Sequence, residues 1–336
     1  LIINFLMYKN NSKDSLLNVS NLCVKYKLQT WKHFKSSTFT NYAVNDVSFY
    51  IRKGETLGLV GESGCGKTTT GRSILQLIKN YEGDIIFNNM NLRNLTFNKL
   101  RSIRANLQCI FQDPYGSLNP RMTCGQTIME PLKIFNLIQN KKELYESACN
   151  LLEIVGLNRN MFDKYPHEFS GGQRQRIAIA RAITTKPSLI ICDEPVSALD
   201  VSVQSQIINL LKELQKTNNI AYLFISHDLS IVKYLSDRIA VMYFGSIVEL
   251  ASKDELYNNP LHPYTKALLS AIPIPDPKID RKRKHILLSD DLPNPYDPPS
   301  GCKFHTRCPL VSDKCKTEIP QLDQYKQDHW VSCFNL

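Results

Sequence analysis

Residues 61–68 have the composition of a loop that binds nucleotide phosphates. They read Gly-Glu-Ser-Gly-Cys-Gly-Lys-Thr, between an apolar run expected to be a strand and a segment expected to be a helix. The glycines let backbone N–H groups face an anion, Lys67 reaches the β- and γ-phosphates, and Thr68 offers a hydroxyl to Mg²⁺. A plain glycine-rich turn is the alternative, which the strand and helix disfavour. The expected nucleotide contacts are Gly61, Ser63, Gly64, Cys65, Gly66, Lys67, Thr68 and Thr69.

Two carboxylates follow the apolar segment 189–192. Asp193 and Glu194 come directly after Leu-Ile-Ile-Cys, and ligands in open α/β sheets bind beyond the carboxyl ends of the strands. We therefore expect Asp193 to bind Mg²⁺ and Glu194 to polarise the attacking water. In isolation, an Asp-Glu pair after a strand is more often the beginning of a turn. Its place downstream of the phosphate loop favours the catalytic interpretation.

A second glycine motif lies at residues 170–173, which read Ser-Gly-Gly-Gln and precede a helical segment. Here the sequence resembles the ABC ATPase family, although that family usually has Leu where this chain has Phe169. The resemblance implies that Ser170, Gly171, Gly172 and Gln173 contact the ATP bound by a partner subunit. The physical basis is a helix N-terminus that attracts phosphate. A serine that only caps its helix is the alternative.

Four further positions match the same family pattern. The resemblance implies that Gln112 contacts Mg²⁺ or water, that His227 contacts the γ-phosphate and that Asp200 lies at the dimer seam. It also implies that Tyr26 stacks on adenine, with Tyr42 as a rival. The implied catalytic residues are Lys67, Gln112, Glu194 and His227, and the implied Mg²⁺ ligands are Thr68, Gln112 and Asp193.

The order of apolar segments predicts an α/β fold. Strands are expected at 19–26, 44–51 and 56–60, a helix at 67–78 and mostly helices over 93–157. From 173 onward helices alternate with strands, which favours a mainly parallel sheet. The resemblance implies an ABC-type P-loop NTPase with an antiparallel N-terminal β subdomain. We expect a nucleotide-binding domain at 15–256, with its helical subdomain near 93–172, and a proline- and cysteine-rich region at 257–336.

Composition and charge narrow the protein class. The formal charge is +10, but the only dense basic run is 281–284, so we interpret the excess as solvated surface and expect no nucleic acid. Attraction to an anionic membrane surface is the third interpretation. No segment reaches the roughly 20 apolar residues of a membrane-spanning helix. The apolar start lacks a basic flank and is not expected to be a signal peptide; Met7 is an alternative first residue.

The C-terminal segments 261–265, 271–275 and 298–309 look like the tail of oligopeptide and dipeptide importer ATPases. This resemblance implies a motor that couples ATP hydrolysis to peptide uptake at the cytoplasmic face of the bacterial inner membrane. The implied partners are a companion ABC ATPase, two permease subunits and an extracytoplasmic peptide-binding protein. Gln173 favours the second, F-type ATPase subunit, because the companion typically has Met there.

Four cysteines lie close together near the C-terminus, at Cys302, Cys308, Cys315 and Cys333. Their spacing matches neither zinc-finger pairs nor the short ferredoxin run. Four thiolates in a loop-rich segment still suggest a metal site. The importer resemblance implies a [4Fe–4S] cluster, with Cys₄ zinc and free thiols as alternatives and His305 as a competing ligand. The other six cysteines are dispersed and are expected to be reduced and mostly buried.

Other functions are also possible for such a motor. The cargo could be nickel, haem or a sugar. A soluble ABC ATPase acting on nucleic acid is a second alternative, but such proteins carry a long coiled coil or a repeated domain that this chain lacks. A catalytically dead interaction module conflicts with Lys67, Asp193 and Glu194.

Overall fold

The computed structural model describes residues 15–32, 35–273, 286 and 293–336. The basic run 281–284 and the alternative start Met7 lie outside these residues. The chain divides into two compact units: residues up to 50 with 57–90 and 227–336, and residues 51–56 with 91–226. We call them the first and the second unit.

The first unit contains an antiparallel sheet built mainly from the N-terminal segments. Its strand order is β2-β1-β4-β5, and β1 and β4 pair from Leu17 opposite Phe87 to Cys23 opposite Glu82. The expected strands at 19–26 and 44–51 are present but extend further, and the strand that begins at Glu82 was not predicted. The bounds are β1 Ser15–Lys32, β2 Lys35–Arg52, β4 Glu82–Phe87 and β5 Met90–Asn91.

A second group of strands in the first unit joins distant parts of the chain. β3 pairs with β9 in parallel, whereas β9–β10, β10–β12 and β12–β11 pair antiparallel. The tail after residue 257 therefore adds strands beside β10. These strands were not predicted from the proline-rich segment, because they are short. The bounds are β3 Thr56–Val60, β9 Arg238–Tyr243, β10 Ser246–Ser252, β11 Asp323–Lys326 and β12 His329–Val331.

The helices of the first unit are short. The helix after the phosphate loop ends at Ile74 rather than at the expected residue 78, because Gln76 has a positive φ of 57°, which a regular helix does not allow. The helices are α2 Lys67–Ile74, α9 Leu229–Leu235, α10 Lys253–Asn258, α11 Pro263–Ser270, η4 His305–Arg307 and α13 Asp313–Thr317.

The second unit has a parallel three-strand core, in which β7 Leu189–Asp193 lies between β6 Leu107–Ile110 and β8 Ala221–Ser226. Strand β7 is fully buried, as expected of a parallel strand covered on both faces. Strand β6 interrupts the mostly helical segment predicted over 93–157; its four residues are too few to show a period.

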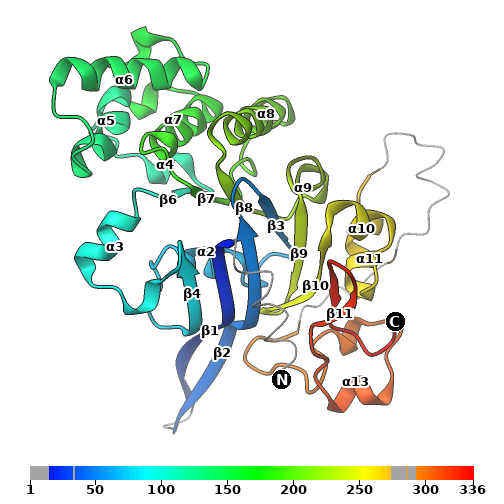
Figure 1. The fold of residues 1–336 in the computed structure, drawn as a ribbon. Helices are drawn as coiled ribbons and strands as arrows, with labels where there is room; N and C mark the ends of the chain where they lie inside the picture. Colours follow the sequence, from blue (N-terminus) through cyan, green and yellow to red (C-terminus); the bar gives the residue numbers. More distant parts are fainter. Residues whose placement is uncertain (1–14, 33–34, 274–285, 287–292) are drawn as a thin grey trace. The chain divides into compact units, whose positions relative to one another are not determined.

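Helices make up most of the second unit. Figure 1 shows α5, α6 and α7 packed side by side, and α7 is the helix that follows the Ser-Gly-Gly-Gln motif. Among the described residues, no helix has both the length and the apolar character needed to cross a membrane. The helices are η1 Leu92–Asn94, α3 Phe97–Ile103, α4 Pro114–Ser117, α5 Cys124–Ile134, α6 Lys141–Ile154, η2 Arg159–Met161, η3 Pro166–Glu168, α7 Gly171–Ile183 and α8 Val201–Asn218.

Candidate nucleotide-binding site

The phosphate loop in the first unit connects β3 to α2, as the sequence predicts. Gly66 has a φ of 107°, and a Cβ there would lie 2.2 Å from the carbonyl oxygen of Ala43. Only glycine fits such a conformation and such a close approach. Ser63 and Gly64 are exposed, so the backbone N–H groups in this part of the loop are open to an incoming anion.

Lys67 is buried at the first position of α2. Its Nζ donates hydrogen bonds to the carbonyl oxygens of Gly61, at 2.8 Å, and Glu62, at 2.9 Å. The ammonium group is therefore held directly against the loop that it serves. Burial raises the pKa of Cys65, although the Lys67 charge acts in the opposite direction. The Cys65 thiol is therefore neutral and acts in the loop as a small buried side chain.

The second unit brings Gln112 and Glu194 together. Gln112 follows β6 and Glu194 follows β7, and Gln112 Nε2 donates to Glu194 Oε2 over 2.9 Å. Asp193, the last residue of β7, is buried with 5% of its surface exposed. The parallel pairing of β6 and β7 places these polar residues at the same edge of the sheet. The sequence predicted this position at the end of a strand for Asp193 and Glu194 but not for Gln112.

Glu194 has an unusual backbone conformation, with a φ of 47°. Positive φ is uncommon for a residue with a Cβ and is often found at functional sites. The turn is fixed on both sides: the Glu194 N–H donates to the Ile225 carbonyl at 3.0 Å, and the Glu194 carbonyl accepts from the Ser197 hydroxyl at 3.1 Å. The carboxylate is therefore carried by a well-defined turn. Composition alone gave no sign of this conformation.

The Ser-Gly-Gly-Gln motif forms the N-terminus of α7. Ser170 caps the helix by accepting from the Gln173 N–H, and the Gln173 side chain accepts from the Ser170 N–H at 3.0 Å. This is a capping box, so the capping alternative holds locally. It does not compete with anion binding, because Ser170 and Gly171 are exposed. The atypical Phe169 is buried.

The packing of α7 against α8 explains why the second glycine of this motif, Gly172, has no side chain. A Cβ at Gly172 would lie 2.5 Å from Val203 Cγ1 on α8. Small size at this position therefore lets α7 and α8 approach each other. Asp200, the residue expected at a dimer seam, is exposed at the beginning of α8 and makes no side-chain capping bond.

Four further residues of the predicted set lie in the first unit: Thr68 and Thr69 in the first turn of α2, His227 after β8 and Tyr26 on β1. His227 follows β8 and is exposed; its neighbour Asp228 caps α9 by accepting from the Ser230 N–H at 2.7 Å. Tyr26 on β1 is 43% exposed and its rival Tyr42 on β2 is 42% exposed. Lys25 Nζ lies 5.2 Å from the centre of the Tyr42 ring. Tyr26 as the adenine contact stays a prediction.

Sequence reasoning passed over Glu62, an acidic residue inside the phosphate loop. Its carboxylate accepts two hydrogen bonds from Arg307, and its N–H donates to the hydroxyl of Tyr264. Both partners belong to the tail beyond residue 257. The one available signal was chemical: a carboxylate in an anion-binding loop needs a counter-charge.

The four C-terminal cysteines lie in the small tail subregion around η4 and α13. The Cys302 N–H donates to the Cys315 carbonyl at 2.9 Å, and burial is the main cause that raises the pKa of Cys302, Cys308 and Cys333. Over residues 15–32, 35–273, 286 and 293–336, no group of three or more His, Cys, Asp or Glu side chains is arranged to hold a metal ion. The arrangement of these cysteines, and of His305, therefore gives no support to the predicted [4Fe–4S] cluster or zinc ion.

Four of the six dispersed cysteines are buried, as expected from the sequence for most of them. Cys65, Cys124, Cys149 and Cys192 are buried, whereas Cys23 and Cys109 are partly exposed. None of the ten cysteines, all of which the structure describes, forms a disulfide bond.

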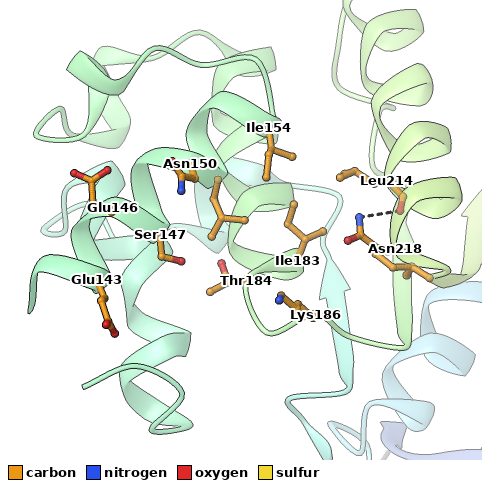
Figure 2. A pocket seen from close by; sticks show the side chains of 12 residues that line it. Glu143, Glu146, Ser147, Asn150, Ile154, Ile183, Thr184, Lys186, Leu214 and Asn218 are labelled. Atoms are coloured by element: carbon orange, nitrogen blue, oxygen red, sulfur yellow. Dashed lines mark hydrogen bonds between the residues drawn. The ribbon is translucent and has the colours of Figure 1, made fainter. Parts of the chain in front are cut away.

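A separate pocket of about 420 Å³ lies in the second unit, away from these motifs. Figure 2 shows Glu146 and Asn150 of α6 on one side and Leu214 and Asn218 of α8 on the other. The pocket is lined by the end of α7 and the last part of α8, whereas Ser170 and Asp200 are the N-cap residues that precede α7 and α8. It therefore has no share in the nucleotide site.

Comparison with known proteins places these motifs in a family. Residues 44–197 match the family model described as ABC transporter, and residues 248–315 match the one described as oligopeptide/dipeptide transporter, C-terminal region. An ATP-binding cassette solved as a dimer in a post-hydrolysis state with ADP and phosphate is 27% identical, with a TM-score of 0.63. That match covers 70% of this chain and 98% of the other.

Curated relatives match over nearly the whole length. The oligopeptide transport ATP-binding protein AppF of Bacillus subtilis is 54% identical over 87% of this chain and 88% of its own. The oligopeptide transport ATP-binding protein OppF of Haemophilus influenzae is 49% identical over 98% of this chain and 100% of its own. The chain therefore belongs to the oligopeptide transport ATP-binding protein family of ABC transporter ATPases.

Proposed function

We propose that the chain binds and hydrolyses ATP as a motor subunit of an ABC importer of oligopeptides or dipeptides. The observation that carries the proposal is the length of the match: identity of 49% extends over 98% of the chain. It therefore includes the tail as well as the ATPase motifs, and residues 248–315 match the C-terminal region of peptide transporters.

The chemistry follows from what phosphoryl transfer requires. Little covalent work is needed, so catalysis consists of positioning and of charge stabilisation on the γ-phosphate. Lys67 and the loop N–H groups bind the phosphates, and Thr68, Gln112 and Asp193 are the oxygen ligands proposed for Mg²⁺. When bound, the ion neutralises charge that develops on the phosphate oxygens.

Glu194 orients and polarises the attacking water. Support comes from the contact in which Gln112 Nε2 donates to Glu194 Oε2, which helps to fix the orientation of the carboxylate. His227 is proposed to contact the γ-phosphate. The exposed N-terminus of α7, with Ser170, Gly171, Gly172 and Gln173, is proposed to complete the site of a companion ATPase, with Asp200 at the seam.

The proposed assembly contains a companion ABC ATPase, two permease subunits and an extracytoplasmic peptide-binding protein. This chain acts at the cytoplasmic face of the membrane, and Gln173 makes it the second of the two ATPases. Residues 15–256 are proposed as the ATPase domain and 257–336 as a C-terminal region. A metal at the four cysteines stays a separate prediction, decided by iron and zinc content after purification without oxygen.

Peptide uptake by the reconstituted importer tests the function. When the importer contains this chain, vesicles are expected to accumulate labelled oligopeptide if ATP is supplied on the side of the membrane where the chain is bound. Glu194→Gln is expected to lower hydrolysis at least 100-fold, since positioned proton acceptors contribute about 10²–10⁴-fold, and to retain ATP binding. Glu213→Gln, at an exposed position of α8, is the matched control. Normal turnover of Glu194→Gln, or wild-type vesicles that take up no peptide, would contradict the proposal.

A further inference from the structure

Glu62 of the phosphate loop is fixed at its amide, its carbonyl and its carboxylate. Its N–H donates to the Tyr264 hydroxyl at 2.9 Å, and its carbonyl oxygen accepts from Lys67 Nζ at 2.9 Å. Its carboxylate accepts from Arg307 at 2.8 and 3.0 Å. Two of these three partners come from the tail, 202 and 245 positions along the chain from Glu62. The tail therefore contacts the loop through its backbone as well as its side chain.

The Arg307–Glu62 pair has the geometry of a strong ion pair. Each carboxylate oxygen receives one guanidinium nitrogen, which is the bidentate arrangement that only arginine provides. The Arg307 side chain is 5% exposed and that of Glu62 is 25% exposed. By contrast, the Lys25–Glu82 pair of the same unit is 35% and 63% exposed and is expected to contribute little. Pairing with Glu62 raises the pKa of Arg307, so it is always charged.

Aromatic packing holds Arg307 in place. Phe304, one turn earlier, is buried and packs edge-on against Tyr243, with ring centres 5.2 Å apart. It also lies 5.5 Å from the Tyr264 ring, so the residue that holds the Glu62 amide and the turn that carries Arg307 share one cluster. The guanidinium carbon of Arg307 lies 5.9 Å from the centre of the Tyr243 ring. Arg307 therefore reaches the loop from a packed base.

The charge of Glu62 explains why such a partner is needed. The loop must bind the triphosphate of ATP, a strong anion, and a carboxylate beside it repels that anion at a range of several ångströms. A bidentate guanidinium cancels this charge locally. If Arg307 is removed, Glu62 keeps its charge in a partly buried position without its counter-ion.

We propose that Arg307 and Tyr264 are positioning residues for ATP binding, through which the C-terminal region fixes Glu62 and neutralises its charge in the phosphate loop. The proposal rests on the proposed ATPase function and assigns the tail a role in nucleotide affinity. Neither residue touches the phosphates; both act through Glu62.

ATP binding by the full chain tests the proposal, with ATP titrated calorimetrically in the Glu194→Gln background. Arg307→Gln is expected to weaken binding about tenfold or more. Arg307→Lys, which keeps the charge but loses the fork, is expected to recover part of that loss. The double variant Glu62→Gln/Arg307→Gln is expected to bind more tightly than Arg307→Gln alone, because the unpaired carboxylate is gone. A role for Arg307 that is independent of the Glu62 charge predicts no such rescue.

Two further variants distinguish a specific loss of ATP binding from a loss caused by misfolding. Arg159→Gln removes an exposed arginine paired with Glu146 and Glu153 and is expected to bind ATP as the parent does. Tyr264→Phe keeps the ring and removes only the hydroxyl that accepts from the Glu62 N–H, so it tests the second contact if Arg307→Gln does not fold. It is expected to weaken binding several-fold.

Two results separate this proposal from the proposed function. If the parent protein binds no ATP, the ATPase function fails. If it binds ATP and folded Arg307→Gln and Tyr264→Phe bind equally well, or if the double variant gives no rescue, the positioning role is overturned. In the intact importer, the expected change for Arg307→Gln is a higher KM for ATP with kcat at saturating ATP largely kept.

Discussion

Single residues decide whether the phosphate loop can form. Gly66 adopts a φ of 107° and approaches Ala43 and Met242, whereas Gly64 has a φ of 81° and no atom within 4 Å of the position that a Cβ would occupy. Both positions need a backbone that other residues rarely adopt, but only Gly66 is also enclosed. Substituting each glycine in turn therefore distinguishes the cost of the backbone conformation alone from that cost combined with a steric clash.

Gly66→Ala is expected to destabilise the protein more than Gly64→Ala. At Gly64 the cost is that of the left-handed backbone, about 1–2 kcal/mol. At Gly66 the same strain is joined by a contact of 2.2 Å with the Ala43 carbonyl, so the loop must move and ATP binding must weaken with it. Thermal melting and ATP titration of both variants check this. Equal losses in the two variants would show that the close approach to Ala43 is not maintained.

The residue scale is also where sequence was most informative. Lys67 and Glu194 could be named as candidates because phosphoryl transfer demands particular groups at particular offsets from strands and helices. Ser170 was named as a candidate from the resemblance to the ABC ATPase family. The bonds of Glu62 to Arg307 and of Gln112 to Glu194 could not be named, since they join residues 245 and 82 positions apart. No local pattern records such separations.

At the scale of elements, helix α11 lies in the first part of the tail, after β10 and α10. His262 caps this helix, with Nδ1 accepting from the Tyr264 N–H at 3.1 Å, and the residue is 1% exposed. Burial is the main cause that lowers the His262 pKa to about 4, with Glu249 acting in the opposite direction. The imidazole is therefore neutral in the folded protein and serves as an acceptor.

The depressed pKa of His262 predicts a loss of stability in acid. The contribution of this group is complete above its ordinary pKa near 6.5 and falls as the pH drops through its folded pKa of about 4. The free energy of unfolding is expected to fall by about 3 kcal/mol in total, because each unit of pKa difference between the folded and unfolded protein corresponds to about 1.36 kcal/mol. His262→Asn keeps a capping oxygen without a proton to gain. Denaturant melts between pH 4 and 7 are expected to show a shallower decline for it than for the parent or for exposed His167→Asn. Parallel curves would contradict this.

Elements were predicted unevenly, for a physical reason. Strand β7 is fully buried and apolar up to Asp193, and helix α8 has an amphipathic pattern, so both were found. Strands β6, β10, β11 and β12 contain polar residues among their few positions, and such strands are specified by their neighbours in the sheet more than by their own composition. The antiparallel pairing of β12 with β10 is the clearest case.

At the scale of the whole molecule, the tail is part of the first unit's core. Glu249 of β10 is fully buried and accepts from His329 Nε2 at 2.8 Å and from the N–H groups of Leu261 and His262. His329 belongs to β12 and is also fully buried. Without the tail, a buried carboxylate would lose its histidine partner and β10 would become an exposed edge.

A chain that ends at Ser270 is therefore expected to be largely insoluble and to bind no ATP, even though every ATPase motif is retained. Soluble yield and ATP titration measure this. The matched control is the full chain with exposed Lys314→Gln in the tail, which is expected to behave as the parent does. A soluble truncated chain with parental ATP affinity would refute the structural role of the tail.

The contact between Glu62 and Arg307 also sets an order of events during synthesis. The phosphate loop leaves the ribosome 245 residues ahead of the arginine that supports it. At about 5–20 residues per second, the wait is roughly 12–50 s. During that time all residues of the second unit, which ends at residue 226, have been synthesised. Translation thus completes the second unit first, and the nascent loop gains its counter-charge only after Arg307 has been synthesised.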